Sequence, residues 1–322
     1  AYEMERGLVG SEMCIRDSFK TLRREQLNFR DFTGGLNLKT APHDIAENEV
    51  QDCQNVLFDE EIGAVVKRKG YIKLGELPVA EVVVRLYTYQ KPDGTRYIIA
   101  QTKTGKIYYT VNRKDWTLLV DLTDNLICDF ETFEGFLWIT NGTDAVRIWD
   151  GSKLWVLDGS TWDSQHTGEA PPNEDPTNNS VNAPKGKYIT LMNERLFIAN
   201  TTDEPCGIFF SRFYDDNGND INAYNANAMP SVNLLRIEGE GGEPIRAIKV
   251  YTGMLVVFKE NAIYVVRQTG PSDVDFAIMK VPTTIGTLYH RSVKIFKNLL
   301  LFLGKNGIYA FNGNKVDKIS TK

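Results

Sequence analysis

The sequence predicts an all-β protein, a β-propeller built from four-stranded antiparallel blades. Of the 322 residues, 11% are aromatic, and aromatic side chains pack well on pleated sheets. From residue 80 onward, short apolar runs alternate with turns rich in Gly, Asn and Asp, and the pattern recurs five times. The second strands of the five copies centre on Ile98, Leu137, Leu196, Val256 and Leu301, at steps of 39, 59, 60 and 45 residues. Repeats of this length are typical of propeller blades.

The composition excludes several classes of protein. A net charge of −5 argues against a broadly basic DNA-binding face, although it fits a protein that DNA passes without adhering. The four cysteines lie far apart and have no histidine at metal-ligand spacing, so reduced thiols are expected rather than disulfides or a zinc site. No apolar run approaches the roughly 18 residues of a membrane span. We therefore expect no membrane span, no cofactor and no metal.

The first 18 residues have no place in this repeat. Residues 8–18, "LVGSEMCIRDS", are identical to the translation of a transposase-type sequencing-library adaptor. The stretch lacks the basic start and apolar centre of a secretory signal, because its charged residues alternate with single apolar ones. We expect residues 1–18 to be a disordered, adaptor-derived artefact. The sequence would then be metagenomic, and the native N-terminus would be missing.

Residues 19–79 are expected to form an N-terminal arm, a short helix and a short first strand. The arm is predicted to be solvated, with phosphate contact as the weaker alternative, and its cationic residues are Lys20, Arg23, Arg24 and Arg30. The spacing of Ile45, Val50, Cys53 and Leu57 predicts the helix, with Asp44 as its N-cap. Residues 63–71, "GAVVKRKGY", then predict a turn and a strand.

Residues 80–322 are expected to form the propeller. The five copies cover residues 83–121, 129–159, 186–213, 244–270 and 290–320. "PDGT" (92–95) and "KTGK" (103–106) predict hairpin turns in the first copy. Two loop-rich inserts, 159–186 and 214–233, lengthen the longer steps. Because five blades with an open last blade close awkwardly, we expect the chain to be truncated at its C-terminus.

No motif predicts a catalytic, cofactor-binding or metal-binding residue. The three histidines, His43, His166 and His290, accompany no hydrolase or P-loop pattern, so exposed or hydrogen-bonded roles are expected for them. "DDNGND" (215–220) is rich in oxygen ligands but lacks the EF-hand spacing, so a solvated insert is favoured over a calcium loop. The Trp and Tyr residues follow strand periodicity and are expected in the core rather than in a sugar-binding groove.

Three segments, residues 32–71, 192–216 and 245–270, resemble tail proteins of short-tailed bacteriophages, namely the tail nozzle (tail tubular protein B) group and the packaged-DNA stabilisation proteins. The first, residues 32–71, matches the Gly-Gly turn, proline and "G…R.G" pattern of that family at Gly34, Gly35, Pro42, Asn55, Gly63, Arg68 and Gly70. The second, residues 192–216, matches its Arg-Leu-aromatic strand and Asp-rich loop at Arg195, Leu196, Phe197, Ser211 and Asp215. A third segment, residues 245–270, resembles a strand pair of the family. The order of these segments carries the resemblance.

The resemblance implies a structural virion protein, not an enzyme, that acts as a head–tail connector or tail nozzle. It implies a cyclic homo-oligomer, a hexamer, that contacts portal or adaptor and tail proteins and forms part of the channel that retains and ejects genomic DNA. The protein would lie in the virion tail, and in the host cytoplasm during assembly. Two alternatives stay open: a carbohydrate-binding or glycan-hydrolysing propeller, and a propeller scaffold for protein partners.

Overall fold

The computed structural model describes residues 31–58, 63–73, 75–165, 169–239, 242–270 and 275–320. The predicted artefact at residues 1–18, the cationic arm residues Lys20, Arg23, Arg24 and Arg30, and His166 lie outside the described residues. The chain divides into two units, residues 1–73 and residues 74–322, and each is described by itself.

The first unit contains two small sheets. Strand β1 (Gly35–Leu36) pairs in parallel with β2 (Glu49–Val50), and β3 (Val56–Leu57) pairs antiparallel with β4 (Val66–Lys67). Strand β4 lies within the predicted strand segment 63–71.

The helix predicted across Ile45–Leu57 is wrong. Its residues form turns and the strands β2 and β3, and Asn55 has the left-handed φ of 59°. Spacings of five, three and four residues give the predicted helix only a weak apolar face, and none of its four apolar side chains is fully buried. A helix of this length is marginal in water without a surface to pack on. The backbone instead bonds across the unit, where the Asn37 N–H donates to the Val50 carbonyl (2.8 Å).

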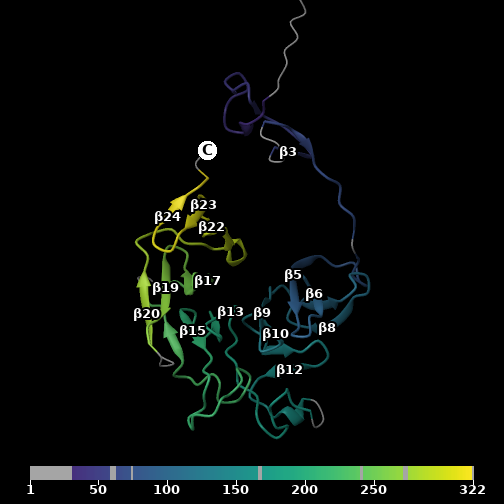
Figure 1. The fold of residues 1–322 in the computed structure, drawn as a ribbon, viewed down its shortest axis with the longest axis vertical. Coiled ribbons are helices and arrows are strands. Elements are labelled where there is room, and N and C mark those ends of the chain that lie inside the picture. The colour runs from purple at the N-terminus through teal and green to yellow at the C-terminus, as the bar shows by residue number, and fades with distance from the viewer. Residues whose placement is uncertain are drawn as a thin grey trace, which may run out of the picture. The chain divides into compact units, whose positions relative to one another are not determined.

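The second unit confirms the predicted fold: five four-stranded antiparallel sheets follow one another around a ring and form a five-bladed β-propeller (Figure 1). Each blade is made of four consecutive strands in sequential order. Blade 1 contains β5 (Val83–Gln90), β6 (Arg96–Thr102), β7 (Lys106–Thr110) and β8 (Thr117–Asp121). Blade 2 contains β9 (Asp129–Phe133), β10 (Phe136–Thr140), β11 (Val146–Trp149) and β12 (Leu154–Leu157).

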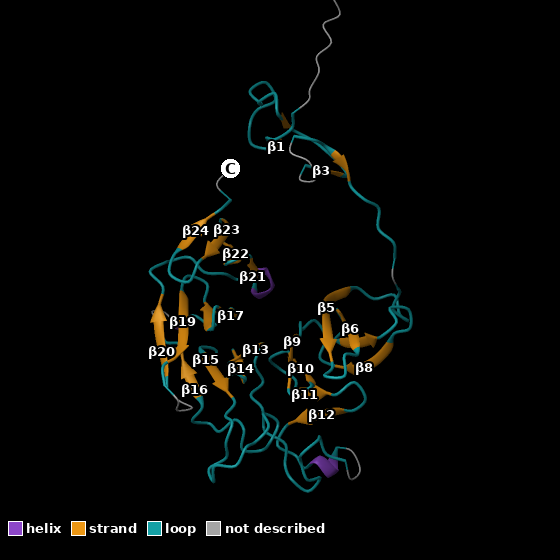
Figure 2. Cartoon of the chain, viewed as in Figure 1, coloured by secondary structure: helices purple, strands orange, loops and turns teal. Residues whose placement is uncertain are grey.

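Blades 3 to 5 repeat this order. Blade 3 contains β13 (Tyr188–Met192), β14 (Arg195–Ala199), β15 (Gly207–Phe210) and β16 (Leu234–Arg236). Blade 4 contains β17 (Ala247–Tyr251), β18 (Met254–Phe258), β19 (Ile263–Gln268) and β20 (Phe276–Lys280). Blade 5 contains β21 (Lys294–Phe296), β22 (Leu299–Gly304), β23 (Gly307–Phe311) and β24 (Val316–Lys318). Two single-turn 3-10 helices, η1 (Trp162–Ser164) and η3 (His290–Ser292), lie in connecting segments (Figure 2).

The five residues predicted as centres of second strands all lie on second strands, namely β6, β10, β14, β18 and β22. The first hairpins of blades 2, 3 and 4 close with two-residue turns. In the blade 2 turn, Glu134 and Gly135 have φ values of 50° and 78°, and Thr252 and Gly253 in blade 4 have values of 47° and 73°. Two consecutive positive φ values match the twist of adjacent antiparallel strands, so these turns set the register of each blade.

The apolar core is divided among the interfaces between successive blades. One buried cluster joins blades 1 and 2 around Trp149, and one joins blades 2 and 3 around Trp138. Two further clusters join blades 3 and 4 around Phe197, and blades 4 and 5 around Phe302. Successive sheets therefore bury the faces that they turn toward one another, as stacked blades must.

The segment that leads into blade 1 is held by Glu81. The Lys106 ammonium donates to Glu81 at 2.7 Å, and the Thr104 hydroxyl also donates to that carboxylate. The hydrogen bond from Lys106, followed by those from Thr104 and Thr102, lowers the pKa of Glu81 to about 2 from its ordinary 4.5. A lowered folded-state pKa stabilises the fold above the unfolded pKa, and this contribution is lost as the pH falls from about 4.5 toward 2.

We therefore expect Glu81→Gln to lower the urea midpoint at pH 6 and to have a smaller effect at pH 3. Equilibrium urea unfolding at both pH values measures the difference. Glu238→Gln, at an exposed glutamate after β16, is the matched control and should leave the midpoint unchanged at both. An equal loss from Glu81→Gln at both pH values would contradict the assignment.

Candidate functional site

The first strands of all five blades line one cavity of about 380 Å³ near the axis of the ring. We call it the axial cavity. Blades 1 and 2 contribute Arg85, Asp129 and Glu131, and blades 4 and 5 contribute Lys249 and Lys294. The segment before β21 adds further residues to the wall, His290 and Arg291 from η3 and Val293. A second cavity, of about 600 Å³, shares Arg85, Asp129, His290 and Arg291. The axial region is thus the place where all five blades bring side chains together.

Asp129 is the centre of the hydrogen-bond network in this region. Its Oδ1 accepts from the Arg85 guanidinium (3.0 Å), and its Oδ2 accepts from the Ile189 N–H (3.1 Å) and pairs with Nε2 of His290 (3.0 Å). Burial raises the pKa of Asp129, but the hydrogen bonds and charges of these partners outweigh burial and hold it below its ordinary value. The ionised carboxylate therefore joins blades 1, 2 and 3 to η3.

The helix η3 brings blade 5 to the same region. The His290 ring packs at a tilt of 34° against Tyr188 of blade 3, with 4.5 Å between centroids, and Arg291 donates to the Val84 carbonyl of blade 1 (2.6 Å). Two nitrogen atoms here are buried without a hydrogen-bond partner, Nε of Arg85 and Nδ1 of His290. The sequence prediction of a hydrogen-bonded histidine is confirmed for His290.

The two inserts pack on one another within the chain. The Val181 N–H of the first insert donates to the Tyr224 carbonyl of the second (2.8 Å), and the Tyr224 hydroxyl donates to the Pro172 carbonyl (2.8 Å). Trp162 of η1 and Tyr224 are buried in the cluster that joins blades 2 and 3. The two inserts therefore pack together against blades 2 and 3.

Blade 5 exposes one apolar face. Cross-strand pairs place Phe296 opposite Leu299 and Leu303 opposite Ile308, while the Ile319 N–H donates to the Ile308 carbonyl. The exposed fractions of these five side chains lie between 38% and 58%. We call these five residues the blade-5 face. The opposite face of the same sheet, with Leu300 and Phe302, is buried against blade 4. Among the described residues, no buried cluster covers the blade-5 face.

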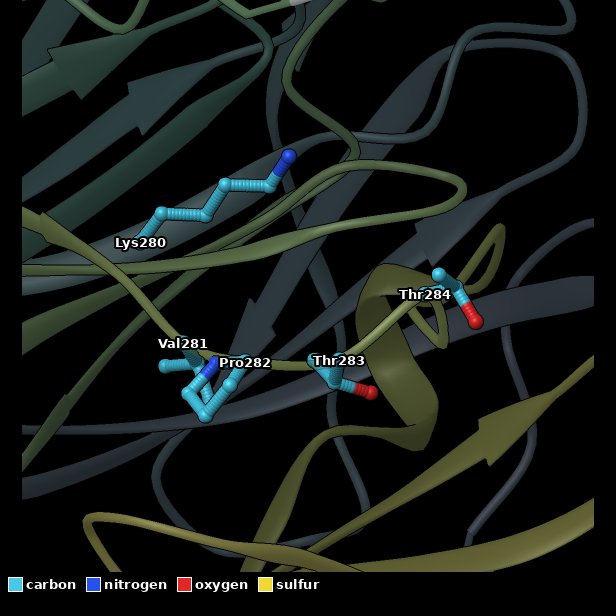
Figure 3. Close-up of a pocket in the computed structure, with 5 residues that line it drawn as sticks. All are labelled: Lys280, Val281, Pro282, Thr283 and Thr284. Atoms are coloured by element: carbon cyan, nitrogen blue, oxygen red, sulfur yellow. The ribbon is translucent and has the colours of Figure 1, made fainter.

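A further depression, between blade 4 and η3, does not gather functional groups. It is lined by five consecutive residues, Lys280–Thr284. Figure 3 shows the Lys280 side chain extending away from the hydroxyl groups of Thr283 and Thr284. Side chains that do not converge on one point cannot surround a ligand, so we do not assign a site there.

The family-motif residues of the first segment lie in the first unit. Gly35 and Gly63 have φ values of 66° and 82°, which favour glycine. The Asn55 carbonyl accepts from the Arg68 N–H (2.7 Å), and the Arg68 guanidinium lies over the Tyr71 ring at 5.9 Å. The remaining motif residues of this segment, Gly34, Pro42 and Gly70, lie in loops and turns. Their contacts indicate roles in backbone geometry.

The motif residues of the second segment are brought together in blade 3. Arg195, Leu196 and Phe197 lie on β14 and are buried. The Ser211 hydroxyl accepts from the Leu196 N–H (2.9 Å), and the Arg195 guanidinium lies over the Phe213 ring at 4.6 Å.

Asp215 lies outside this cluster, in an exposed turn of the second insert. Its carboxylate accepts from the Asn217 and Asn219 N–H groups, both at 2.8 Å. The Asn219 side-chain amide also donates to it (2.9 Å), and this hydrogen bond, followed by that from the Asn219 N–H, lowers the pKa of Asp215. In the described part of the chain, no group of three His, Cys, Asp or Glu residues is placed to hold a metal. The hydrogen bonds of Asp215 therefore all lie within its own turn and stabilise that turn.

The sequence prediction missed the residues of the axial cavity. Four of the five inner strand segments carry a charged residue next to apolar ones, namely "VVRLY", "DFETF", "AIKVY" and "SVKIF", whereas β13 of blade 3 carries none. A charged residue that recurs in the first strand of most blades was the available signal.

Comparisons with known proteins identify no family. No family model and no curated protein matches the chain. Among solved structures, BamB from Moraxella catarrhalis has a TM-score of 0.44 at 10% identity, with 80% of this chain and 64% of that chain covered. BBS1N in complex with ARL6DN has a TM-score of 0.42 at 12% identity, covering 75% and 68%. The C-terminal WD40 domain of Sif2 has a TM-score of 0.39 at 9% identity, covering 76% and 60%. Because each TM-score is below 0.5, we base no argument on these likenesses.

As for membranes, the described helices include none of the length and hydrophobicity that a membrane crossing requires.

Proposed function

We propose that this protein is a structural component of a bacteriophage virion, a head–tail connector or tail nozzle that self-associates into a cyclic hexamer. In this role it contacts portal or adaptor and tail proteins, and its ring forms part of the channel that retains and ejects the genome. The order of family-like segments along the sequence supports the proposal. The observation that carries it is the blade-5 face, because exposed apolar patches of this kind mark protein–protein interfaces.

The occupant that we propose for this face is a second copy of the chain. A cyclic assembly needs a surface on each subunit that its neighbour covers. Burying a fully exposed large apolar side chain contributes about 1.5–3 kcal/mol. The five side chains of the face are already about half covered, so each would contribute about half of that amount to the contact. Burying a charged residue there instead would oppose association.

We expect the unmodified protein to form rings with six-fold symmetry in negative-stain images and to have the mass of a hexamer by light scattering. Ile308→Glu should shift it to monomers, because the new carboxylate would be buried without a partner. Ile278→Glu, at a residue 40% exposed on the outer strand β20, is the matched control and should leave the mass unchanged. A wild-type monomer, or an Ile308→Glu hexamer, would refute the proposal.

The axial cavity bears on the alternative of a glycan-processing propeller. It brings Asp129 and Glu131 together with the ring of Tyr87, which is the kind of arrangement that a glycosidase requires. However, the hydrogen bonds to Asp129 occupy both of its oxygen atoms. These partners hold the pKa of Asp129 below its ordinary value, which makes it unsuited to act as the general acid of a carboxylate pair.

A further inference from the structure

The axial cavity concentrates positive charge in a chain whose net charge is −5. Its wall carries four cationic side chains, Arg85, Lys249, Arg291 and Lys294, and two carboxylates, Asp129 and Glu131. Counting these four cations against these two carboxylates gives an excess of two positive charges. Three of the four cations come from the inner strands β5, β17 and β21, and the fourth comes from η3. The inner strands and η3 therefore hold this excess of positive charge near the axis of the ring.

Neither carboxylate forms a hydrogen bond or a close ion pair with Lys249 or Lys294, although the charge of Lys249 lowers the pKa of Glu131 and that of Asp129 raises the pKa of Lys294. Asp129 is engaged with Arg85, His290 and the Ile189 N–H. Glu131 accepts a hydrogen bond from the Thr132 N–H (3.2 Å), and burial raises its pKa. Within the described part of the chain, the side chains of Lys249 and Lys294 have no hydrogen bond and no ion pair within 4.0 Å. Their charge is thus available to a ligand.

The cations also repel one another. Lys294 is exposed overall, but partial burial lowers its pKa, and the charges of Arg85, Lys249 and Arg291 lower it further against the opposing charge of Asp129. Burial, together with the charge of Arg85, likewise lowers the pKa of Arg291. An anion between these groups would relieve the repulsion and replace the lost hydration of each cation.

We propose that the axial cavity binds a small, multiply charged oxyanion of the phosphate and diphosphate class, held by Lys249, Lys294 and Arg291. Ammonium and guanidinium groups donate charge-assisted hydrogen bonds to phosphate oxygens. A volume of about 380 Å³ accommodates a small ion with its remaining water, and inner strands from all five blades surround it. The bound anion would link Lys249 of blade 4 to Lys294 of blade 5 and to Arg291 of η3 inside the cavity. Elsewhere, blades 4 and 5 are already linked by the ion pair between Glu260 and Lys305 (2.9 Å).

Isothermal titration calorimetry of the full chain with inorganic diphosphate, in a low-salt buffer free of phosphate and sulfate, tests the proposal. We expect one ion to bind per chain. Lys249→Gln and Lys294→Gln should each weaken binding by about tenfold, since each removes one charged donor. Lys103→Gln, at an exposed lysine between β6 and β7, is the matched control and should have no effect. Glu131→Gln should strengthen binding, because it removes a negative charge from the wall.

Two further titrations, one with ADP and one with the Lys249→Arg variant, complete the experiment. ADP shares the diphosphate group, so ADP binding that Lys249→Gln weakens assigns nucleotide phosphates as a source, while binding of inorganic diphosphate alone assigns the free ion. Lys249→Arg keeps the charge and should keep binding, which separates loss of the donor from loss of the fold. The absence of binding by either ligand at millimolar concentration, or equal weakening by Lys103→Gln, would overturn the proposal. The virion role is tested separately, through the self-association of Ile308→Glu.

Discussion

Replacing Asp129 by alanine is expected to lower the free energy of unfolding by about 3–5 kcal/mol, the usual cost of removing one partner from a buried ion pair. Asp129 is 5% exposed and accepts hydrogen bonds from Arg85 and the Ile189 N–H, besides its pairing with His290. Without the carboxylate, the Arg85 guanidinium would remain largely buried and uncompensated. Equilibrium urea unfolding followed by tryptophan fluorescence measures the loss.

A double substitution shows how much of the lost stability comes from leaving the Arg85 charge unpaired. Arg85→Met together with Asp129→Ala removes both partners, so part of the lost stability should return. Asp124→Ala, at an exposed aspartate before β9, is the matched control and should change stability by less than about 0.5 kcal/mol. If Asp129→Ala behaved like this control, Asp129 would not be the link between the blades.

Replacing Trp149 by alanine is expected to cost a similar amount, about 3–5 kcal/mol, for a different reason. Trp149 is 1% exposed between blades 1 and 2, and its ring contacts those of Tyr89, Tyr97 and Tyr109 at centroid distances of 5.6, 4.9 and 4.7 Å. Alanine would leave a cavity that the surrounding rings can fill only in part. Urea unfolding again provides the measurement.

Tyr214→Ala, at an aromatic residue that is 51% exposed, controls for the loss of an aromatic ring as such and should be nearly neutral. Trp149→Phe keeps most of the apolar volume and should recover more than half of the loss. A loss below about 1 kcal/mol from Trp149→Ala would show that blades 1 and 2 do not depend on this cluster.

The blade architecture could be predicted because its signals are local. Apolar alternation, turn residues and repeat length depend on neighbours in the sequence, so the second-strand positions from Ile98 to Leu301 were correctly placed. The same approach failed for residues 45–57. Spacing alone cannot reveal whether a surface exists for a helix to bury, and this segment bonds to Asn37 and Arg68 instead.

The candidate site could not be predicted from the sequence for a related reason. Asp129 and His290 are 161 residues apart, and only the return of the chain around the ring brings them within 3.0 Å. Likewise, the exposure of Ile308 depends on whether a further sheet covers its blade, which the alternation within β23 does not determine. A strand pattern shows which residues share a face, but not what the face contacts.

Every blade is made of four consecutive strands, so no sheet among the described residues combines strands from distant parts of the sequence. The propeller is then close to a linear array, in which each blade is stabilised by its neighbours. Among the described residues, the sheet of blade 5 is packed in an apolar cluster on one face alone, although η3 also contacts blades 1 to 3, so the hydrogen bonds of blade 5 are expected to open earlier. Blade 3, which is packed on both sides and carries the inserts, should be the last to lose its hydrogen bonds.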